Sequence, residues 1–418
     1  MKIAFHSPLR KGLTVAVVSA ATLVYVGLAA REFAASWLAG RVQLKNLQRA
    51  AWLEPSDADF RNRLGRFYDL VARDPSSAIE NYKAAVQINP LSARYWFDLA
   101  NAYQVAGDTT RQSEALEQAI RTDPMTPDVA WEAANLYLVQ GQNDKALREY
   151  HVVMANDSSL AGSAVRYCWR IDPDVDRLLQ DVVPASADAY IPFLLLLEDK
   201  QETAGTVKVW NALLQTNQPF EKRYAYDYVH YLIHHKEVDQ AVAVWDATTQ
   251  RYGLGAYVSS STNLVVNPGF AMNPLNAGFD WQYQKQYGVN LMLDPGEHHS
   301  GQRSLLINFD GPGIQDGGIY QFVPVQPNTK YEFSAYYKNG EIEGAGGPHF
   351  TIQDMYTQAV YYESDELKDA SFWKSVYGEF TTSPDCKLIV VHVRRLPPGS
   401  PIRGKLWVAD FRLTRKQS

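Results

Sequence analysis

The sequence predicts a multidomain protein with an N-terminal transmembrane helix, an all-α solenoid of helical repeats and a C-terminal all-β sandwich. Three observations predict this arrangement. Residues 13–30 form an uncharged apolar run, prolines recur at intervals of 35 and 34 residues in the region that follows, and short alternating segments broken by Gly, Pro and Asn fill the last third. Since single hydrophobic cores stop growing at roughly 250–300 residues, a chain of 418 residues is expected to form several domains.

The predicted boundaries follow these changes in pattern. We expect a cytoplasmic segment at 1–12, a membrane helix at 13–30, helical repeats at 31–254, a small polar linker at 255–262 and the sandwich at 263–418. The formal net charge of -6 provides no positive field for a phosphate backbone. Nucleic acid is therefore not an expected partner.

Cysteine and histidine usage limits the kinds of site that the chain can form. The two cysteines, Cys168 and Cys386, lie in different predicted domains, which excludes a disulfide framework. Neither a CxxC nor an HExxH spacing occurs. We interpret the neighbouring His234 and His235 as a solvated helix end rather than as metal ligands.

The apolar run at 13–30 is long enough to cross a hydrocarbon core, because a helix rises about 1.5 Å per residue. Lys2, Arg10 and Lys11 precede it, which predicts a cytoplasmic N-terminus and an extracytoplasmic remainder, on the periplasmic side of a bacterial inner membrane. The alternative is secretion after signal cleavage, since residues 27–29 form a small-x-small site. We favour the anchor, because residues 33–53 continue directly in a helical pattern.

The region after the membrane segment contains internal repeats. Pro55, Pro90 and Pro124 each follow an amphipathic stretch that a proline would terminate. Superposed on this frame, several positions coincide: Tyr68, Tyr103 and Tyr137; Gly107 and Gly141; Ala78, Gln112 and Ala146; Tyr82, Leu116 and Tyr150; Ala85, Ala119 and Val153. At such positions two antiparallel helices meet, with a large residue beside a small one and a glycine at the turn.

This pattern resembles the tetratricopeptide repeat (TPR), whose first helix is matched by Trp96, Leu99, Ala100 and Tyr103. The resemblance implies a stack of helix pairs, of which we expect five to six, ending near Tyr252. Residues 38–55 are expected to be a lone second helix that continues the membrane segment. Because such stacks leave a concave face free, a protein partner is expected there, while the aligned tyrosines are expected to pack in the core.

Helical periodicity ends after residue 253, and short alternating segments follow. Strands are expected at 303–309, 319–325, 330–338, 349–354, 373–381, 388–394 and 405–413. Seven or more short strands in about 155 residues predict a sandwich.

Several segments of this region carry a more specific signal. They are NLVVNPGF at 263–270, GFDW at 278–281, HSGQRSL at 299–305 and GKLWVADFRL at 404–413. In order and spacing they resemble the jelly-roll carbohydrate-binding modules of the family 4/9 type. The resemblance implies a galactose-binding-like jelly roll that binds a polysaccharide or another glycan.

The resemblance also implies a structural calcium, which many members hold with a glutamate after the opening motif and paired aspartates in the last strand. Here Ala271 and Ala409 replace two of these carboxylates, which leaves Asp410 as the expected ligand. Calcium prefers six to eight oxygens. The loss of two carboxylates argues against the ion, although backbone carbonyls could still serve, and no other cofactor is expected.

Sugar recognition needs aromatic rings to cover the C–H face of a pyranose and planar polar groups for its hydroxyls. The expected sugar-binding residues are Trp281, Tyr283, Tyr287, Gln353, Tyr356, Tyr361 and Tyr362. The alternative is that these side chains pack the sandwich or its contact with the helical region.

No nucleophile elbow, Walker loop, Rossmann fingerprint or zincin motif occurs. Glu341 and Glu343 lie two apart on an expected hairpin turn, and we interpret them as solvated rather than as a glycosidase pair. We therefore expect a non-enzymatic envelope adaptor that serves the synthesis, export or assembly of a surface polysaccharide. A purely protein-binding scaffold whose sandwich has no sugar site is the alternative.

Overall fold

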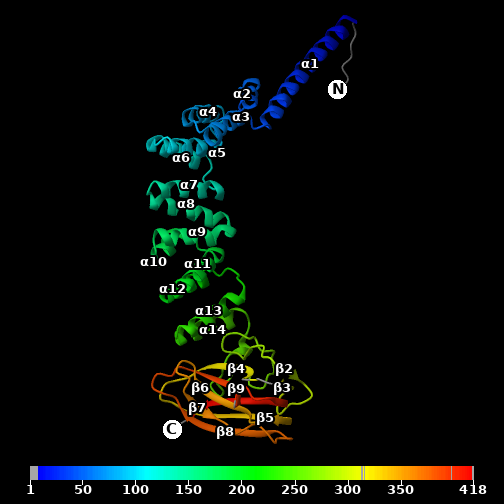
Figure 1. The fold of residues 1–418 in the computed structure, drawn as a ribbon, viewed down its shortest axis with the longest axis vertical. Helices are drawn as coiled ribbons and strands as arrows, with labels where there is room; N and C mark the ends of the chain where they lie inside the picture. Colours follow the sequence, from blue (N-terminus) through cyan, green and yellow to red (C-terminus); the bar gives the residue numbers. More distant parts are fainter. Residues whose placement is uncertain (1–7, 312–313, 315, 397, 417–418) are drawn as a thin grey trace. The chain divides into compact units, whose positions relative to one another are not determined.

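The computed structural model describes residues 8–311, 314, 316–396 and 398–416. The chain forms two compact units. One contains residues up to 196 together with 208–217, and the other contains 197–207 together with 218 onwards. The predicted fold class is confirmed: helices fill the first part of the chain, and the second unit ends in an all-β sandwich (Figure 1).

Helix α1 (Pro8–Ala39) contains the predicted membrane segment. Its portion Lys11–Ala39 is long and apolar enough to cross a membrane, and none of its most apolar window is buried. The last turns of the helix belong to the folded domain, because Ala35 and Ala39 pack in one cluster with Leu47 of α2 and Phe60 of α3. The apolar helix therefore reaches the folded domain, but residues 38–55 do not form one helix as expected, because a break at 40–43 separates α1 from α2.

The following helices are short and of similar length. They are α2 (Leu44–Leu53), α3 (Ala58–Phe67), α4 (Pro75–Ile88), α5 (Ala93–Val105), α6 (Thr109–Thr122), α7 (Pro127–Val139), α8 (Asn143–Asn156), α9 (Ser158–Ile171), α10 (Val175–Arg177), α11 (Ala187–Asp199), α12 (Thr203–Gln215), α13 (Lys222–His234) and α14 (Val238–Arg251). Short π-helical turns follow α3 (η1, Tyr68–Ala72) and α10 (η2, Leu178–Val182), and a 3-10 turn follows α14 (η3, Gly255–Tyr257).

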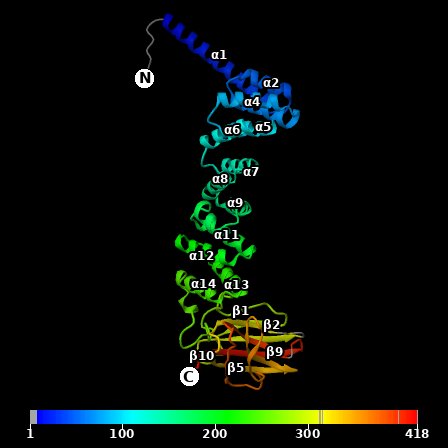
Figure 2. The same ribbon diagram turned by 90° about the vertical axis from the view of Figure 1, so that its left-hand side faces the viewer.

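Helices α3 to α8 form successive pairs in chain order (Figures 1 and 2). Pro55, Pro90 and Pro124 each lie two residues beyond the end of a helix, as expected. Gly107 and Gly141 adopt φ values of +74° and +71° at the turns within two pairs, where a side chain would be strained. The predicted contact of large with small residues is present, since a Cβ on Gly65 would lie 2.7 Å from the ring of Tyr82.

The aligned aromatic residues mostly pack in the helical core, as expected. Tyr82, Tyr103, Tyr137 and Tyr150 are buried, whereas Tyr68 is partly exposed. Tyr150 also stacks on Tyr167 with ring centroids 5.5 Å apart. These rings therefore stabilise the helix pairs and offer little surface to a ligand.

The sandwich consists of two five-stranded antiparallel sheets. The first has the order β1-β4-β9-β6-β7 and the second β2-β3-β10-β5-β8. Their bounds are β1 Gln282–Tyr283, β2 Val289–Asp294, β3 Ser304–Gly311, β4 Asp316–Pro324, β5 Lys330–Gly344, β6 Gly347–Asp354, β7 Val360–Glu363, β8 Lys374–Thr381, β9 Leu388–Leu396 and β10 Ile402–Arg415. All seven predicted strands are present, together with three short ones that the sequence pattern did not predict.

Side chains from both sheets fill the space between them. Ile307, Phe333, Phe350, Val391 and Phe411 are almost completely buried in this core. Glu341 and Glu343 were expected on a hairpin turn, and this expectation is wrong. Both lie in β5, which extends to Gly344 and pairs with β10 over this stretch. Cys168 and Cys386 are both buried and unbridged.

The second unit also contains the last helix pair, α13 and α14. Tyr356 lies in the loop after β6, and its hydroxyl donates a hydrogen bond of 2.8 Å to the Ile233 carbonyl of α13. Trp245 of α14 meets the ring of Phe279 edge-on at 6.3 Å. Lys387 forms an exposed ion pair of 2.6 Å with Asp239. This helix pair and the sandwich are therefore packed together.

Candidate functional site

The outward-facing side chains of the first sheet form the candidate site. Successive residues of a strand point to opposite sides, and the core positions of β4, β9 and β6 fix which residues point outward. Three cross-strand rows result from the registers. The rows are Phe322, Val390 and Gln353; Tyr320, His392 and Thr351; and Asp316, Arg394 and His349. We call these nine residues the β9 face, because β9 is their middle strand.

Aromatic rings line one edge of the β9 face. Tyr320 meets His392 with ring centroids 5.2 Å apart and Phe322 at 5.3 Å. Phe322 is covered by the edge of the His230 ring of α13, at 6.0 Å. Tyr320 remains partly exposed. It is therefore the aromatic side chain of this face that can meet a ligand.

Planar polar groups occupy the middle of the face. Arg394 donates from Nη1 to the Gln353 amide oxygen at 3.1 Å, and Gln353 donates in turn to Gln358 at 2.8 Å. The Asp316 carboxylate accepts from the Gly318 amide at 2.9 Å, and its other oxygen lies 3.6 Å from His392 Nδ1. These contacts hold the polar side chains in place without using all of their hydrogen-bonding capacity.

Three buried polar atoms of the β9 face have no hydrogen-bond partner among the described residues. They are Thr351 Oγ1, His392 Nδ1 and Arg394 Nε. An unsatisfied buried polar group costs about 1–3 kcal/mol, so such groups are uncommon in folded proteins. Thr351 and His392 lie directly opposite each other in the sheet. Two of the three atoms therefore belong to one cross-strand pair.

Burial sets the charges of this face. It lowers the pKa of His392 to about 4, with a smaller contribution from the positive charge of Arg394. The imidazole is therefore neutral at pH 7 and can both donate and accept a hydrogen bond. Burial also raises the pKa of Asp316, against the effect of the Gly318 hydrogen bond. Asp316 is the one carboxylate among the nine residues, whereas glycoside hydrolysis normally requires two.

The outer side of the second sheet has a different character, because several of its charges form ion pairs with one another. Glu379 contacts Lys330 at 2.5 Å and also Lys416, and these hydrogen bonds lower its pKa to about 2. The exposed Tyr377 hydroxyl donates to Glu379 at 2.7 Å. This side is typical of a solvated protein surface.

Trp281, which the sequence suggested as a sugar-stacking ring, lies in the sandwich core. It is 0% exposed and packs against Phe270 and Phe411, with ring centroids 5.0 and 4.8 Å away. Its indole nitrogen donates to the Asn267 carbonyl at 3.1 Å. Neither face of the ring can meet a sugar, because core side chains cover both.

The remaining predicted residues are spread over several places. Gln353 belongs to the β9 face. Tyr283 lines a hollow of about 360 Å³ with Met292 and Pro274, and Tyr287 is 83% exposed in the loop before β2. The structure therefore does not bring the predicted set together.

Three predicted tyrosines have packing roles. Tyr356 bonds to α13 as described above. The Tyr361 ring stacks on Phe380 at 5.9 Å, and its hydroxyl hydrogen-bonds with Ser383 at 2.9 Å. The Tyr362 ring lies against Gly378 of the other sheet, where a Cβ would come within 2.1 Å of it. Both tyrosines therefore join the two sheets at their edge.

Tyr320, Asp316, His392, Arg394 and Thr351 were not predicted as site residues. A signal for two of them exists, since His392 and Arg394 alternate with valines in the run LIVVHVRRL at 388–396. Such alternation indicates a strand with one polar side. It does not indicate whether that side binds a ligand or only water.

Asp410, the expected calcium ligand, is engaged by protein groups. Its Oδ2 atom lies 2.6 Å from His299 Nδ1 and accepts from Ser300 Oγ at 2.7 Å. Within the described residues, no group of three or more His, Cys, Asp or Glu side chains could hold a metal ion. The carboxylate set that the family resemblance implies is thus not assembled here.

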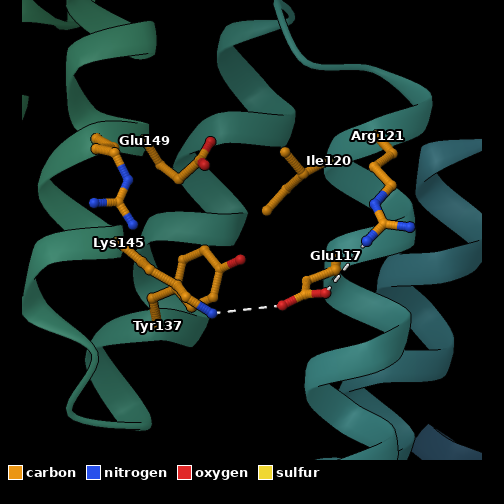
Figure 3. Close-up of a pocket in the computed structure, with 7 residues that line it drawn as sticks. Glu117, Ile120, Arg121, Tyr137, Lys145 and Glu149 are labelled. Atoms are coloured by element: carbon orange, nitrogen blue, oxygen red, sulfur yellow. Dashed lines mark hydrogen bonds and ion pairs between the residues drawn. The ribbon is translucent and has the colours of Figure 1, made fainter.

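The helical repeats contain a separate charged pocket of about 250 Å³ (Figure 3). Glu117 of α6 lies 3.5 Å from Lys145 and 3.6 Å from Arg121, and the Lys145 ammonium lies 5.1 Å from the centre of the Tyr137 ring. Burial raises the pKa of Glu149, which faces the same space. These ion-pair distances are longer than the 2.7–2.9 Å that is typical of a strong charge-assisted hydrogen bond.

Comparisons with known proteins agree with this arrangement. Residues 262–398 match the family model of the carbohydrate-binding-module 4/9 type, which is described as a carbohydrate binding domain. No curated protein matches the chain.

Similar solved structures cover separate parts of the chain. A MamA crystal structure is 20% identical over 42% of this chain and 86% of its own, with a TM-score of 0.25. A CBM4 structure is 13% identical over 36% of this chain and 99% of its own, with a TM-score of 0.29. A xylan-binding CBM22 domain from Paenibacillus barcinonensis is 13% identical over 36% of this chain and 93% of its own, with a TM-score of 0.26. Residues 262–398 thus match the model of a carbohydrate binding domain of the 4/9 type, and a region of helix pairs precedes them in the chain.

Proposed function

We propose that this protein is a non-enzymatic, membrane-anchored adaptor in which the sandwich binds a glycan through the β9 face and the helical repeats bind a protein partner. Three features support the proposal: the family match of the sandwich, the helix-pair architecture and the apolar helix α1. The proposed setting is the bacterial envelope, in the synthesis, export or assembly of a surface polysaccharide.

The observation that carries glycan binding is the cluster of unsatisfied polar atoms beside an aromatic ring. Thr351 Oγ1, His392 Nδ1 and Arg394 Nε can hydrogen-bond to sugar hydroxyls, and the Tyr320 ring can cover a C–H face. Hydroxyl-rich ligands therefore match this surface better than apolar or strongly charged ones.

Affinity electrophoresis of the full chain in detergent through gels that contain surface polysaccharides tests the proposal. We expect retention by at least one polysaccharide, and Tyr320→Ala and Arg394→Ala to weaken it about tenfold, since each removes at least about 1.4 kcal/mol of contact. Tyr377→Ala on the opposite sheet is the matched control and should be retained like the wild type. Equal retention of all three variants would exclude the β9 face as the site.

A protein-binding scaffold without a sugar site is the second candidate. It is favoured by the packing of α13 on the sandwich, through Tyr356 and Phe322. In that case the sandwich would serve mainly to cap the last helix pair. The electrophoresis separates the two functions, because a cap predicts no retention by any polysaccharide.

We propose the pocket of Glu117, Lys145 and Arg148 as a contact point for the protein partner. It lies mainly between α6 and α8, the second helices of two successive pairs, with Tyr137 of α7 beside it. The concave face of the stack remains the other proposed docking surface. In the pocket, the side chains of Lys145 and Arg148 would pair with acidic side chains of the partner.

A further inference from the structure

The start and the end of the sandwich meet at one place. The Phe411 amide of β10 donates to the Pro268 carbonyl at 3.1 Å, and the Asn263 side chain donates to the Phe411 carbonyl at 2.9 Å. Asp410 lies beside Gly269, because a Cβ added to Gly269 would come within 3.1 Å of the Asp410 carboxylate. The opening segment 263–271 is thus fixed against β10 where the resemblance implies calcium.

Arg303 binds the carbonyls of this segment. Its Nε atom donates to the Phe270 carbonyl at 2.6 Å, and Nη2 donates to the Ala271 carbonyl at 2.8 Å. The planar guanidinium presents its donors as a fixed fork, so two adjacent carbonyls can be held at once. A positive charge therefore already lies against the carbonyl oxygens that a cation would need.

The Asp410 carboxylate is occupied in a similar way. His299 Nδ1, Ser300 Oγ and the Ser300 amide all lie within 3.2 Å of its Oδ2 atom. The His299 ring is itself fixed, because it stacks on Tyr336 with centroids 3.7 Å apart. Asp410 has a φ of +51°, so this carboxylate is held in a backbone conformation that the surrounding contacts must stabilise.

Charge balance distinguishes a calcium ion from an arginine at this place. With Ala271 and Ala409 in place of carboxylates, a divalent cation would face Asp410 alone and leave excess positive charge. The Arg303 guanidinium carries a single positive charge and bonds to two neutral carbonyls. Oxygen supply gives the same result, because two carbonyls and one carboxylate offer at most four oxygens, whereas calcium takes about six to eight.

We propose that Arg303 replaces the calcium ion: its guanidinium holds the opening segment, while His299 and Ser300 hold Asp410, and the sandwich folds and works without calcium. This inference does not depend on whether the β9 face binds sugar. It assigns to Arg303 a positioning role at the junction of residues 268–271 with β10.

Calorimetric titration of the full chain in detergent with calcium chloride, up to about 10 mM, is the first test, since weak extracellular sites bind at about 0.1–1 mM. We expect no saturable binding that depends on Asp410. A single site that is lost in Asp410→Asn would overturn the proposal. Binding that persists in Asp410→Asn would place calcium elsewhere and leave the proposal intact.

Hydrogen exchange followed by mass spectrometry provides the second test. In Arg303→Gln, we expect the amides of Phe411 and of residues 269–272 to exchange about tenfold faster, because two charge-assisted hydrogen bonds are lost. Addition of calcium should not restore protection. Arg412→Gln, which changes an exposed arginine of β10 next to Phe411, is the control and should exchange like the wild type. Unchanged exchange in Arg303→Gln would contradict the positioning role.

Discussion

Asp280 is a buried carboxylic acid whose charge opposes folding at neutral pH. Its side chain is 0% exposed, one oxygen accepts from the Leu275 amide at 2.7 Å, and the other has no partner among the described residues. Burial raises its pKa from 3.8 to about 6. The folded state therefore holds the proton more tightly than the unfolded chain, and stability falls as pH rises through this interval.

We predict that Asp280→Asn stabilises the sandwich at pH 8 but not at pH 4. The amide keeps an acceptor for Leu275 and cannot ionise, whereas the wild type loses up to about 3 kcal/mol between these pH values, at about 1.4 kcal/mol for each pKa unit. Thermal denaturation at both pH values measures the difference. A variant that is less stable than the wild type at pH 8 would contradict the burial argument.

His392 gives a second pH-dependent prediction, which concerns binding. Because its pKa is lowered to about 4, the neutral form that can bind hydroxyl groups persists across the physiological range. We expect polysaccharide affinity to stay constant from pH 8 to 5 and to fall near pH 4. Histidine-selective NMR titration should show one imidazole with a midpoint near 4. A midpoint near 6.5 for His392 would mean that the β9 face is open to water.

Gly278 explains how the last helix pair packs on the sandwich. The residue has a φ of +57°, and a Cβ there would lie 2.0 Å from the ring of Trp245 of α14. The Trp245 indole nitrogen also donates to the Tyr257 carbonyl at 3.1 Å, so the ring cannot easily move away. A methyl group at this position would therefore separate α14 from the loop before β1.

We predict that Gly278→Ala lowers the melting temperature of the second unit and increases hydrogen exchange in α14. Overpacking costs about 1–3 kcal/mol, and each kcal/mol shifts the melting temperature by about 2–4 °C in domains of this size. Gly253→Ala isolates the backbone effect, because that glycine has a φ of +66° and no atom near its Cβ position. Equal shifts in the two variants would show that contact with Trp245 is unimportant.

Elements with a strong periodic signal could be predicted from the sequence. The 34- and 35-residue spacing of prolines gave the helix pairs, and the alternating runs gave the seven long strands. Strands β1, β7 and β2 were missed because they contain two, four and six residues and lie at sheet edges, where few side chains are buried. Their pairing depends on neighbouring strands rather than on their own pattern.

The candidate site was harder to predict, because it depends on strand register and on what covers each sheet. Trp281 directly precedes strand β1 and Tyr320 lies within β4, yet the first ring is fully buried in the core and the second points outward. Residue type alone does not separate them. The coverage of Phe322 by His230, which is more than 90 residues away in the chain, carries no local signal at all.

Helix α1 connects the proposed membrane anchor to the folded part of the chain. Arg31 forms two hydrogen bonds with Glu54 after α2, at 2.8 and 2.9 Å, and Ala35 and Ala39 are almost fully buried. Cleavage after Ala29 would leave Arg31 in the first turn of a ten-residue helix. A positive charge is unfavourable at a helix N-terminus, and so short a helix is marginal. The intact helix is therefore the more stable arrangement.

We predict that the N-terminal segment is retained and that the rest of the chain is extracytoplasmic. The intact mass of protein purified from membranes should include residues 1–29, and alkaline carbonate should not release the protein. Lys2, Arg10 and Lys11 favour a cytoplasmic N-terminus, so alkaline phosphatase fused to the C-terminus should be active. Replacing these three residues by glutamate should lower that activity. An N-terminus at Ala30 would instead identify a secretion signal, and the glycan-binding face would then act in solution rather than at the membrane.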